Sequence, residues 1–216
     1  MTKCTITSSQ LSSKQLSPHQ ESSHQKSPNQ LTNEQLEHSW PAFSEQILDF
    51  MAELNLDTLK LNCDHVALRV NSVAAADSLS TYFAKQGNVI SNNIINGRPI
   101  LIIELDTPMR LGEMLIECVE LPYPSDKPYP VEGWEHIELV LPSEAQTCEQ
   151  LQHELLAVVP QLGPILAGQT TIKVKQSSPK GEHERLANPT IAFKRDNLCI
   201  KIHSHGIKAV IASEAK

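Results

Sequence analysis

Hydrophobic positions along this 216-residue chain become regular only after a polar N-terminal segment. In residues 1–35 apolar side chains are scarce, and glutamine recurs at every fifth position from Gln10 to Gln35. A period of five fits neither a helix nor a strand, and so polar a segment cannot bury enough apolar surface to offset the entropy of ordering. The pattern predicts a disordered, Gln/Ser-rich tail over residues 1–35.

A helical period follows the tail. Apolar side chains recur three or four residues apart from Phe43 to Leu54, which predicts an amphipathic helix that packs on the domain after it. Ser39 is a candidate cap for this helix. Pro41 suits its first turn, because a proline there loses no helical hydrogen bond.

The rest of the chain repeats one order of elements. Apolar runs predict strands, helical spacing predicts one helix in each half, and Asn96-Gly97 predicts a hairpin turn. The expected order is strand, helix and three strands, twice, with a stiff linker of four prolines between the halves. We expect one α+β domain over residues 36–216, with the first βαβββ unit at about 61–121 and the second at about 134–205.

Both units open on a strand in which a histidine follows an acidic residue. The two segments are Cys63–Val70, with Asp-His at its start, and Trp134–Leu141, with Glu-His at its start. Side chains alternate along a strand, so each histidine shares a face with the residues two positions on. The duplication predicts two half-sites that face one central cavity, and therefore a metal site between the repeats.

Composition narrows the class of protein. The net charge of −7 and the absence of a Lys/Arg stripe argue against nucleic-acid binding. No apolar run is long enough to span a bilayer, and the polar N-terminus does not resemble a signal peptide, so we expect a cytoplasmic protein. The five cysteines never form a CxxC pair, which argues for small core residues rather than disulfides or a zinc finger.

Two βαβββ units that each open on a histidine resemble the vicinal oxygen chelate superfamily, which includes glyoxalase I, methylmalonyl-CoA epimerase and extradiol dioxygenases. There, the first and last strands of each unit give metal ligands, and Leu115-Ile116-Glu117 resembles a closing strand. The resemblance implies a curved mixed sheet with His65, Glu117 and His136 as ligands. Two histidines and a carboxylate suit Fe, Mn, Ni or Zn.

More narrowly, the chain resembles the YecM-type family, from about residue 36 to its end. The segments that carry this resemblance are 63–69, 120–124, 133–138 and 201–203. That family is described as metal-binding by structural similarity to isomerases and oxidoreductases, without an assigned reaction. The resemblance therefore implies a fold and a site, but no substrate.

The position of a fourth ligand departs from the superfamily pattern. Aligning the last strands of the two units places Lys201 at the position of Glu117, and an ammonium group does not ligate a metal. His203 lies two residues on, on the same face, and completes the site if the strand is shifted. Alternatively, Lys201 pairs with Glu117 or Glu138 and replaces the metal.

The remaining candidates each allow two readings. Glu138 is a general base or a salt-bridged acid, and Arg69 holds a substrate carboxylate or pairs with a neighbouring acid. The histidines and Glu117 could also be hydrogen-bonded or ion-paired core residues without a metal.

Two functions follow. A metalloenzyme would bind a divalent ion and a small oxygen-chelating substrate and stabilise an enediolate or similar oxyanion, with Glu138 moving the proton, in isomerase, lyase or dioxygenase chemistry. The alternative is a non-catalytic module that binds a small molecule or anion in the same cavity through Lys201. We expect a monomer or a homodimer, with a small-molecule ligand and no membrane or nucleic-acid partner. A scaffold whose Gln-rich tail is the binding element is a weaker third reading.

Overall fold

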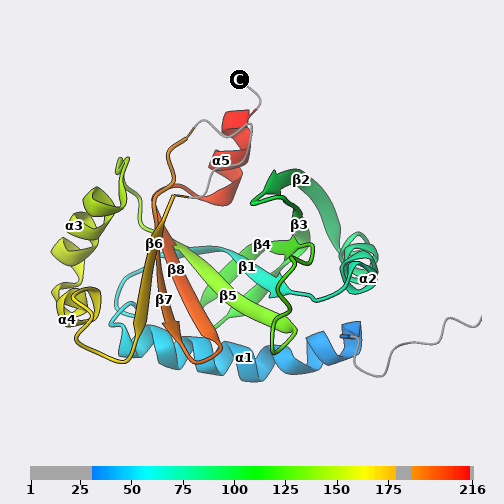
Figure 1. The fold of residues 1–216 in the computed structure, drawn as a ribbon, viewed down its shortest axis with the longest axis horizontal. Coiled ribbons are helices and arrows are strands. Elements are labelled where there is room, and N and C mark those ends of the chain that lie inside the picture. Colours follow the sequence, from blue (N-terminus) through cyan, green and yellow to red (C-terminus); the bar gives the residue numbers. More distant parts are fainter. Residues whose placement is uncertain (1–30, 179–185, 215–216) are drawn as a thin grey trace, which may run out of the picture. The chain divides into compact units, whose positions relative to one another are not determined.

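The computed structural model describes residues 31–178 and 186–214, which form one compact unit (Figure 1). Residues 1–30 lie outside the described part, so the expected disorder of the tail stays a prediction.

One eight-stranded sheet runs through this unit in the order β2-β3-β4-β1-β5-β8-β7-β6. Each half contains one parallel pair, β1 with β4 and β5 with β8, and the halves join through the antiparallel pair of β1 and β5. The strands are β1 (Asn62–Arg69), β2 (Gly87–Ile95), β3 (Arg98–Leu111), β4 (Met114–Pro122), β5 (Gly133–Val140), β6 (Lys173–Ser177), β7 (Thr190–Arg195) and β8 (Leu198–His203). The α+β fold class, with two βαβββ repeats in one mixed sheet, is confirmed.

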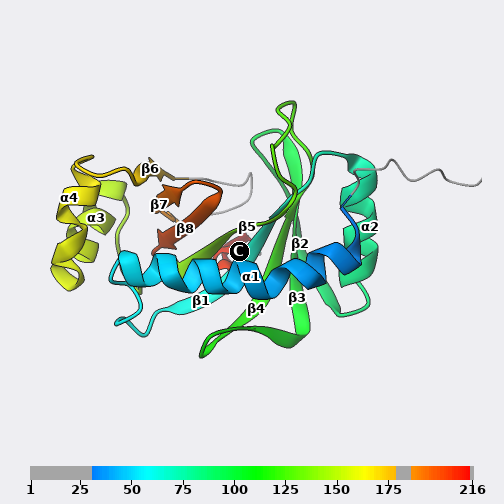
Figure 2. The ribbon, with the colours of Figure 1, turned by 90° about the horizontal axis from the view of Figure 1, so that it is seen from below.

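Helices cover the two faces of the sheet unequally. Four helices and a short 3-10 turn, Pro160–Leu162, pack on the outer face around one hydrophobic core, whereas α5 lies on the opposite, inner face (Figures 1 and 2). The helices are α1 (Asn33–Glu53), α2 (Val73–Phe83), α3 (Cys148–Val158), α4 (Gly163–Leu166) and α5 (Ile207–Glu214).

The first helix begins earlier than its apolar period predicted. Thr32 caps α1 at its first residue, ahead of Ser39, and Pro41 lies inside the helix. The expectation of a start near Ser39 is therefore wrong. A proline in a helix interior removes one backbone hydrogen-bond donor. Near Pro41, two side chains donate to the helix backbone: the Ser39 hydroxyl and the Trp134 indole donate to the carbonyl of Leu36 at 2.8 and 3.0 Å.

The inner face of the first half of the sheet is covered by α5. Its Ile207 and Ile211 pack against a small cluster of Ile100, Ile102 and Cys118. Strand β3 therefore contributes to two cores, one on each face of the sheet, whereas β2 packs only against the small inner cluster, through Ile90 and Ile95. The second half has no such helix on its inner face among the described residues.

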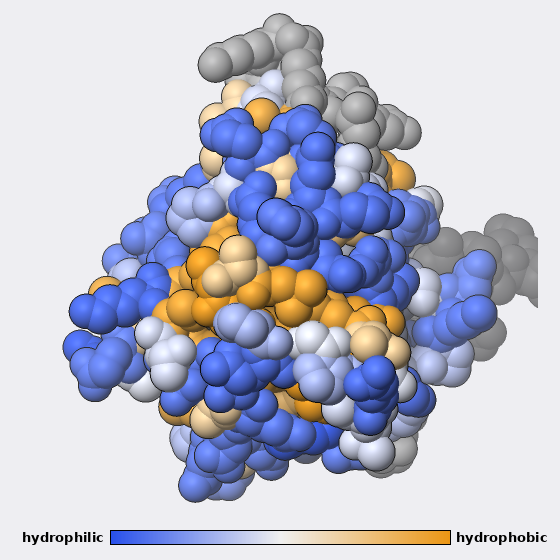
Figure 3. All heavy atoms as spheres, turned by 90° about the vertical axis from the view of Figure 1, so that its left-hand side faces the viewer, coloured by the Kyte–Doolittle hydropathy of each residue, from blue (hydrophilic) through white to orange (hydrophobic). Residues whose placement is uncertain are grey.

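The face that carries α3 and α4 is mostly polar, with a hydrophobic band across it. Figure 3 shows this band crossing the side that carries α3 and α4, and Val158 at the end of α3 is 49% exposed. No helix in the described part of the chain has the length and apolar character that crossing a bilayer requires.

Candidate metal centre

The candidate site lies on the inner face where the two halves of the sheet meet. In the β1–β5 ladder His65 stands opposite Glu138 and Ala67 opposite His136, and in the β1–β4 ladder Ala67 stands opposite Glu120. Residues paired across strands share a face, so these registers gather two histidines and two glutamates. One ligand atom from each of His65, Glu120, His136 and Glu138 lies within 4.8 Å of the others.

Two bulges place an acid beside each histidine. The β1–β5 register shifts between Cys63 and His65 and again where Glu135 precedes His136. A bulge adds a residue to one strand and re-aims its side chain, so Asp64 and Glu135 turn toward the histidine that follows each. The Asp64 Oδ1 lies 3.0 Å from His65 Nδ1, and the Glu135 Oε2 lies 2.7 Å from His136 Nδ1.

These acid–histidine pairs decide which ring nitrogen faces the centre. A carboxylate at Nδ1 keeps a hydrogen on that nitrogen, and the other nitrogen is then free to act as an acceptor or a ligand. In both histidines that second atom is Nε2, and in His136 it contacts Glu138 Oε1. The His65 Nε2 is buried and has no hydrogen-bond partner in the structure.

The spacing of the central atoms suits a small divalent ion. The His136 Nε2 lies 3.0 Å from Glu138 Oε1, and the His65 Nε2 lies 3.4 Å from the same oxygen and 3.7 Å from Glu120 Oε2. Ligand atoms about 2.1 Å from a tetrahedral ion lie about 3.4 Å apart. The four residues therefore fit such an ion without large movement.

Lys201 reaches the same oxygen from the neighbouring strand. Glu138 and Lys201 stand opposite each other in the β5–β8 ladder, and Lys201 Nζ donates to Glu138 Oε1 at 2.6 Å. Of the two pairings considered from the sequence, with Glu117 or with Glu138, the structure shows the second. The side chain of Lys201 is 26% exposed, whereas that of Glu138 is 9% exposed.

The protonation of the centre follows from these contacts. Burial alone would raise the pKa of Glu138, but the Lys201 ammonium and His65 hold it well below its usual range. Burial would lower the pKa of His65, but Glu138 and Asp64 raise it well above its usual range. Burial and Lys201 oppose protonation of His136, and its carboxylate contacts nevertheless raise its pKa. The ion-free centre therefore holds ionised carboxylates against protonated imidazoles.

Glu117 does not belong to this centre. In the β1–β4 ladder Cys118 stands opposite His65, so positions 118 and 120 share its face and position 117 falls out of that alternation. Glu117 is 57% exposed, and its carboxylate accepts from Lys208 Nζ at 2.6 Å. The structure therefore places Glu120 where the sequence alignment had placed Glu117.

The strand registers also show why the alignment failed. Cys118 opposite His65 in the first half corresponds to Cys199 opposite His136 in the second. Counting two residues on from each cysteine makes Glu120, not Glu117, the counterpart of Lys201. The paired Cys-Val-Glu and Cys-Ile-Lys segments were the signal that could have identified Glu120.

His203 lies beside the four-residue group. Asn188 Nδ2 lies 3.1 Å from its Nδ1, its Nε2 lies 3.4 Å from Asp64 Oδ1, and its ring centroid is 6.1 Å from that of His65. Its shortest ion-pair contact with Glu138 is 3.5 Å, through Nδ1. His203 thus contacts the acidic residues of the centre rather than the Nε2 atoms of His65 and His136.

Arg69 pairs with an acid, which is one of the two readings that the sequence left open. Its guanidinium bonds the carboxylate of Glu135 and lies over the ring of Tyr129, 4.9 Å from the centroid. The same carboxylate bonds His136 through its second oxygen. Arg69 therefore fixes Glu135, and Glu135 fixes the imidazole of His136.

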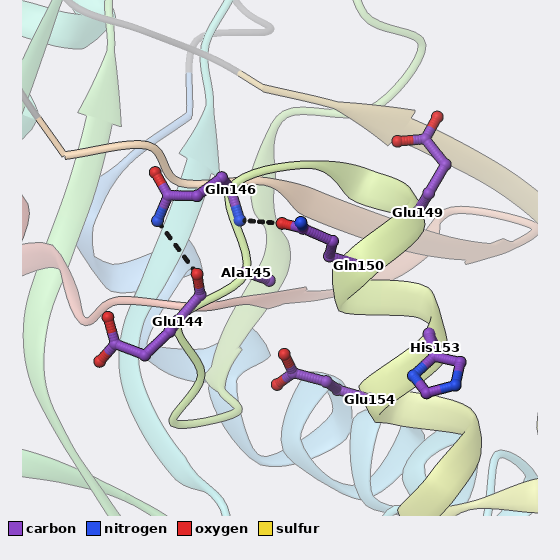
Figure 4. A pocket seen from close by; sticks show the side chains of 7 residues that line it. All are labelled: Glu144, Ala145, Gln146, Glu149, Gln150, His153 and Glu154. Atoms are coloured by element: carbon purple, nitrogen blue, oxygen red, sulfur yellow. Dashed lines mark hydrogen bonds between the residues drawn. The ribbon is translucent and has the colours of Figure 1, made fainter.

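A separate pocket lies outside the centre, between the segment before α3 and the first turns of that helix. Figure 4 shows its lining, in which the Gln146 backbone donates to Gln150 Oε1 at 2.7 Å and the Gln146 side chain to the Glu144 carbonyl at 3.0 Å. Its lining residues are Glu144, Ala145, Gln146, Glu149, Gln150, His153 and Glu154. None of them belongs to the histidine–glutamate group.

Comparisons with known proteins identify the family of this chain. Residues 32–214 match the model of the family described as YecM protein. Protein YecM of Escherichia coli K12 is 41% identical over 174 residues, covering 81% of this chain and 89% of that protein. A Haemophilus influenzae Rd protein described as uncharacterized is 35% identical over 171 residues, covering 77% and 86%. A solved structure titled Structural Genomics, Protein EC4020 superposes with a TM-score of 0.71 at 36% identity, covering 84% of this chain and 92% of that one.

Proposed function

This chain belongs to the YecM protein family, and from its histidine–glutamate group we propose that it is a divalent-metal-binding protein with its ion between the two halves of the sheet. His65, Glu120, His136 and Glu138 hold the ion. Two imidazoles and two carboxylates form a donor set that suits Zn, Fe, Mn or Ni.

The observation that carries this proposal is the free nitrogen of His65. Its Nδ1 is bonded to Asp64, and its Nε2 is buried without a hydrogen bond, although carboxylate oxygens of Glu138 and Glu120 lie 3.4 and 3.7 Å away. A buried polar atom without a partner is costly and calls for a missing ligand or ion. An oriented imidazole whose second nitrogen bonds a carboxylate is the arrangement that metal-binding histidines usually have.

The charge of the centre supports the same conclusion. With neutral histidines, its four carboxylates and two cations leave a formal charge of −2, which one divalent ion neutralises. The groups counted are Asp64, Glu120, Glu135 and Glu138 against Arg69 and Lys201. Without an ion, protonation of His65 and His136 supplies the compensation, consistent with their raised pKa values.

The proposed site acts on small substrates that chelate a metal ion through oxygen atoms. A bound divalent ion supplies a Lewis acid that polarises a substrate oxygen. Asp64 and Glu135 keep the two imidazole lone pairs aimed inward, and Lys201 keeps Glu138 ionised. The low pKa of Glu138 makes it a better ligand than proton acceptor, so we assign it to the ion rather than to proton transfer.

A second candidate function rests on the contact between Lys201 and Glu138. At 2.6 Å the ammonium group already compensates this carboxylate, as an internal cation does in a metal-free ion-pair network. In that case the protein is a module that binds a small molecule or anion without turnover. The alternative predicts that the histidines do not retain a metal.

The deciding experiment measures metal content by elemental analysis and metal affinity by calorimetry. Glu120→Gln is compared with Glu117→Gln, which removes the same charge three residues away. We expect near-stoichiometric metal in the native protein and in Glu117→Gln, with loss of most of it in Glu120→Gln. Absence of metal in the native protein, even after incubation with excess divalent ions, would contradict the proposal and favour the metal-free module.

A further inference from the structure

The inner face of the second half of the sheet is basic, in a chain whose net charge is −7. The registers of β6, β7 and β8 place three residues of each strand on this face, and none of them is acidic. These inward positions are Lys173, Lys175, Ser177, Thr190, Ala192, Lys194, Cys199, Lys201 and His203. We call the three lysines at positions 173, 175 and 194 the lysine face.

Two cross-strand rows connect the lysine face to the metal centre. One row runs from Lys175 through Ala192 and Lys201 to Glu138. The other runs from Lys173 and Lys194 through Cys199 to His136, and the strands concerned lie side by side (Figure 1). Adjacent strands are about 4.8 Å apart, so β7 lies about 10 Å from the ligands on β5.

These lysines lack the compensation that Lys201 has. Lys173 and Lys175 are exposed and Lys194 is partly exposed, and none of the three forms an ion pair within residues 31–178 and 186–214. Lys173 and Lys194 stand directly opposite each other, an arrangement in which like charges destabilise a sheet. An anion that bridges the ammonium groups relieves this repulsion.

We propose that the lysine face binds the phosphate group of a small molecule whose other end reaches the metal centre. Several ammonium groups on one face suit a compact, multiply charged group. Two of the three lysines lie on β6, one strand beyond β7, so the strand spacing sets the distance between the phosphate and the chelating oxygens at about 10–14 Å. The second half of this inference rests on the proposed metal site, whereas anion binding by the lysines does not.

The test is calorimetric titration of the metal-free protein with inorganic pyrophosphate. The combined variant Lys173→Ala, Lys175→Ala, Lys194→Ala is compared with Lys60→Ala, Lys85→Ala, Lys127→Ala, which removes the same charge at exposed positions elsewhere. We expect the first variant to bind at least about tenfold more weakly, because it loses charge-assisted hydrogen bonds. The control variant should stay within about twofold of the native protein, since distant exposed charges are screened.

Metal content measured on the same samples separates the two proposals. No pyrophosphate binding by the native protein, or equal weakening in both triple variants, overturns the lysine face even if the metal is present. Tighter binding of single-stranded oligonucleotide than of pyrophosphate overturns the small-molecule assignment. Lysine-dependent binding of pyrophosphate in a protein that never retains metal leaves the lysine face standing and removes the metal site.

Discussion

Replacing Lys201 with methionine tests how the buried charge of Glu138 is compensated. The ammonium donates to Glu138 Oε1 at 2.6 Å, and the glutamate is 7% exposed. Removing one partner of a buried ion pair costs about 3–5 kcal/mol, because the other charge stays buried. We expect the lower end of that range, since Lys201 is 26% exposed and the protonated imidazoles still lie beside Glu138.

The assay is urea unfolding of the metal-free protein in chelator, followed by far-ultraviolet circular dichroism. A loss of about 3 kcal/mol in the free energy of unfolding corresponds to about 6–12 °C in melting temperature for a domain of this size. Lys194→Met is the matched control and should change stability by less than about 0.5 kcal/mol, because Lys194 has no ion-pair partner among the described residues.

Adding a divalent ion should then restore much of the loss. An ion at a hundred times its dissociation constant stabilises the native state by about 2.7 kcal/mol, and without Lys201 it no longer competes with an ammonium for Glu138. An unchanged unfolding midpoint for Lys201→Met in chelator would refute the reasoning, since Glu138 would then not depend on Lys201.

Three further predictions concern the fold. Gly87→Ala should cost at least about 2 kcal/mol in urea unfolding, because its Cβ would lie 2.0 Å from a backbone oxygen of β3; Gly163→Ala, with open space around it, should be neutral or stabilising. Ile211→Asp should loosen α5 and raise the fluorescence of a hydrophobic dye, whereas unchanged dye binding would show that α5 does not cover the small inner cluster. Burial raises the pKa of Cys118 to about 12. In the native protein a thiol reagent should therefore modify Cys118 far more slowly than the half-buried Cys148. Equal rates of modification would contradict the burial of Cys118.

The main elements were predictable because their signals are local. Turn residues predicted the hairpin at Asn96-Gly97, and the chain does turn there between β2 and β3. Helix starts were less certain, since several polar residues can serve as a cap. The structure uses Thr32, with a glutamine three residues on, where the sequence favoured Ser39.

Only part of the candidate site could be predicted from the sequence. The duplicated acid–histidine pairs identified His65 and His136, because an inward histidine near the start of a strand is a local pattern. The choice between Glu117 and Glu120 was not local, since it depends on how β4 is aligned with β1. A shift of one residue exchanges the two faces of a strand, and no periodicity within β4 settles that shift.

The sequence by itself determined the order of elements in the two βαβββ units and the two histidines that face inward. Only the tertiary structure decided which carboxylates meet those histidines, how the bulges turn Asp64 and Glu135 toward them, and that Lys201 lies on Glu138. The physical reason is that residue preferences act over a few neighbours along the chain. Register, bulges and the side of the sheet on which α5 packs are set by contacts between segments far apart in sequence.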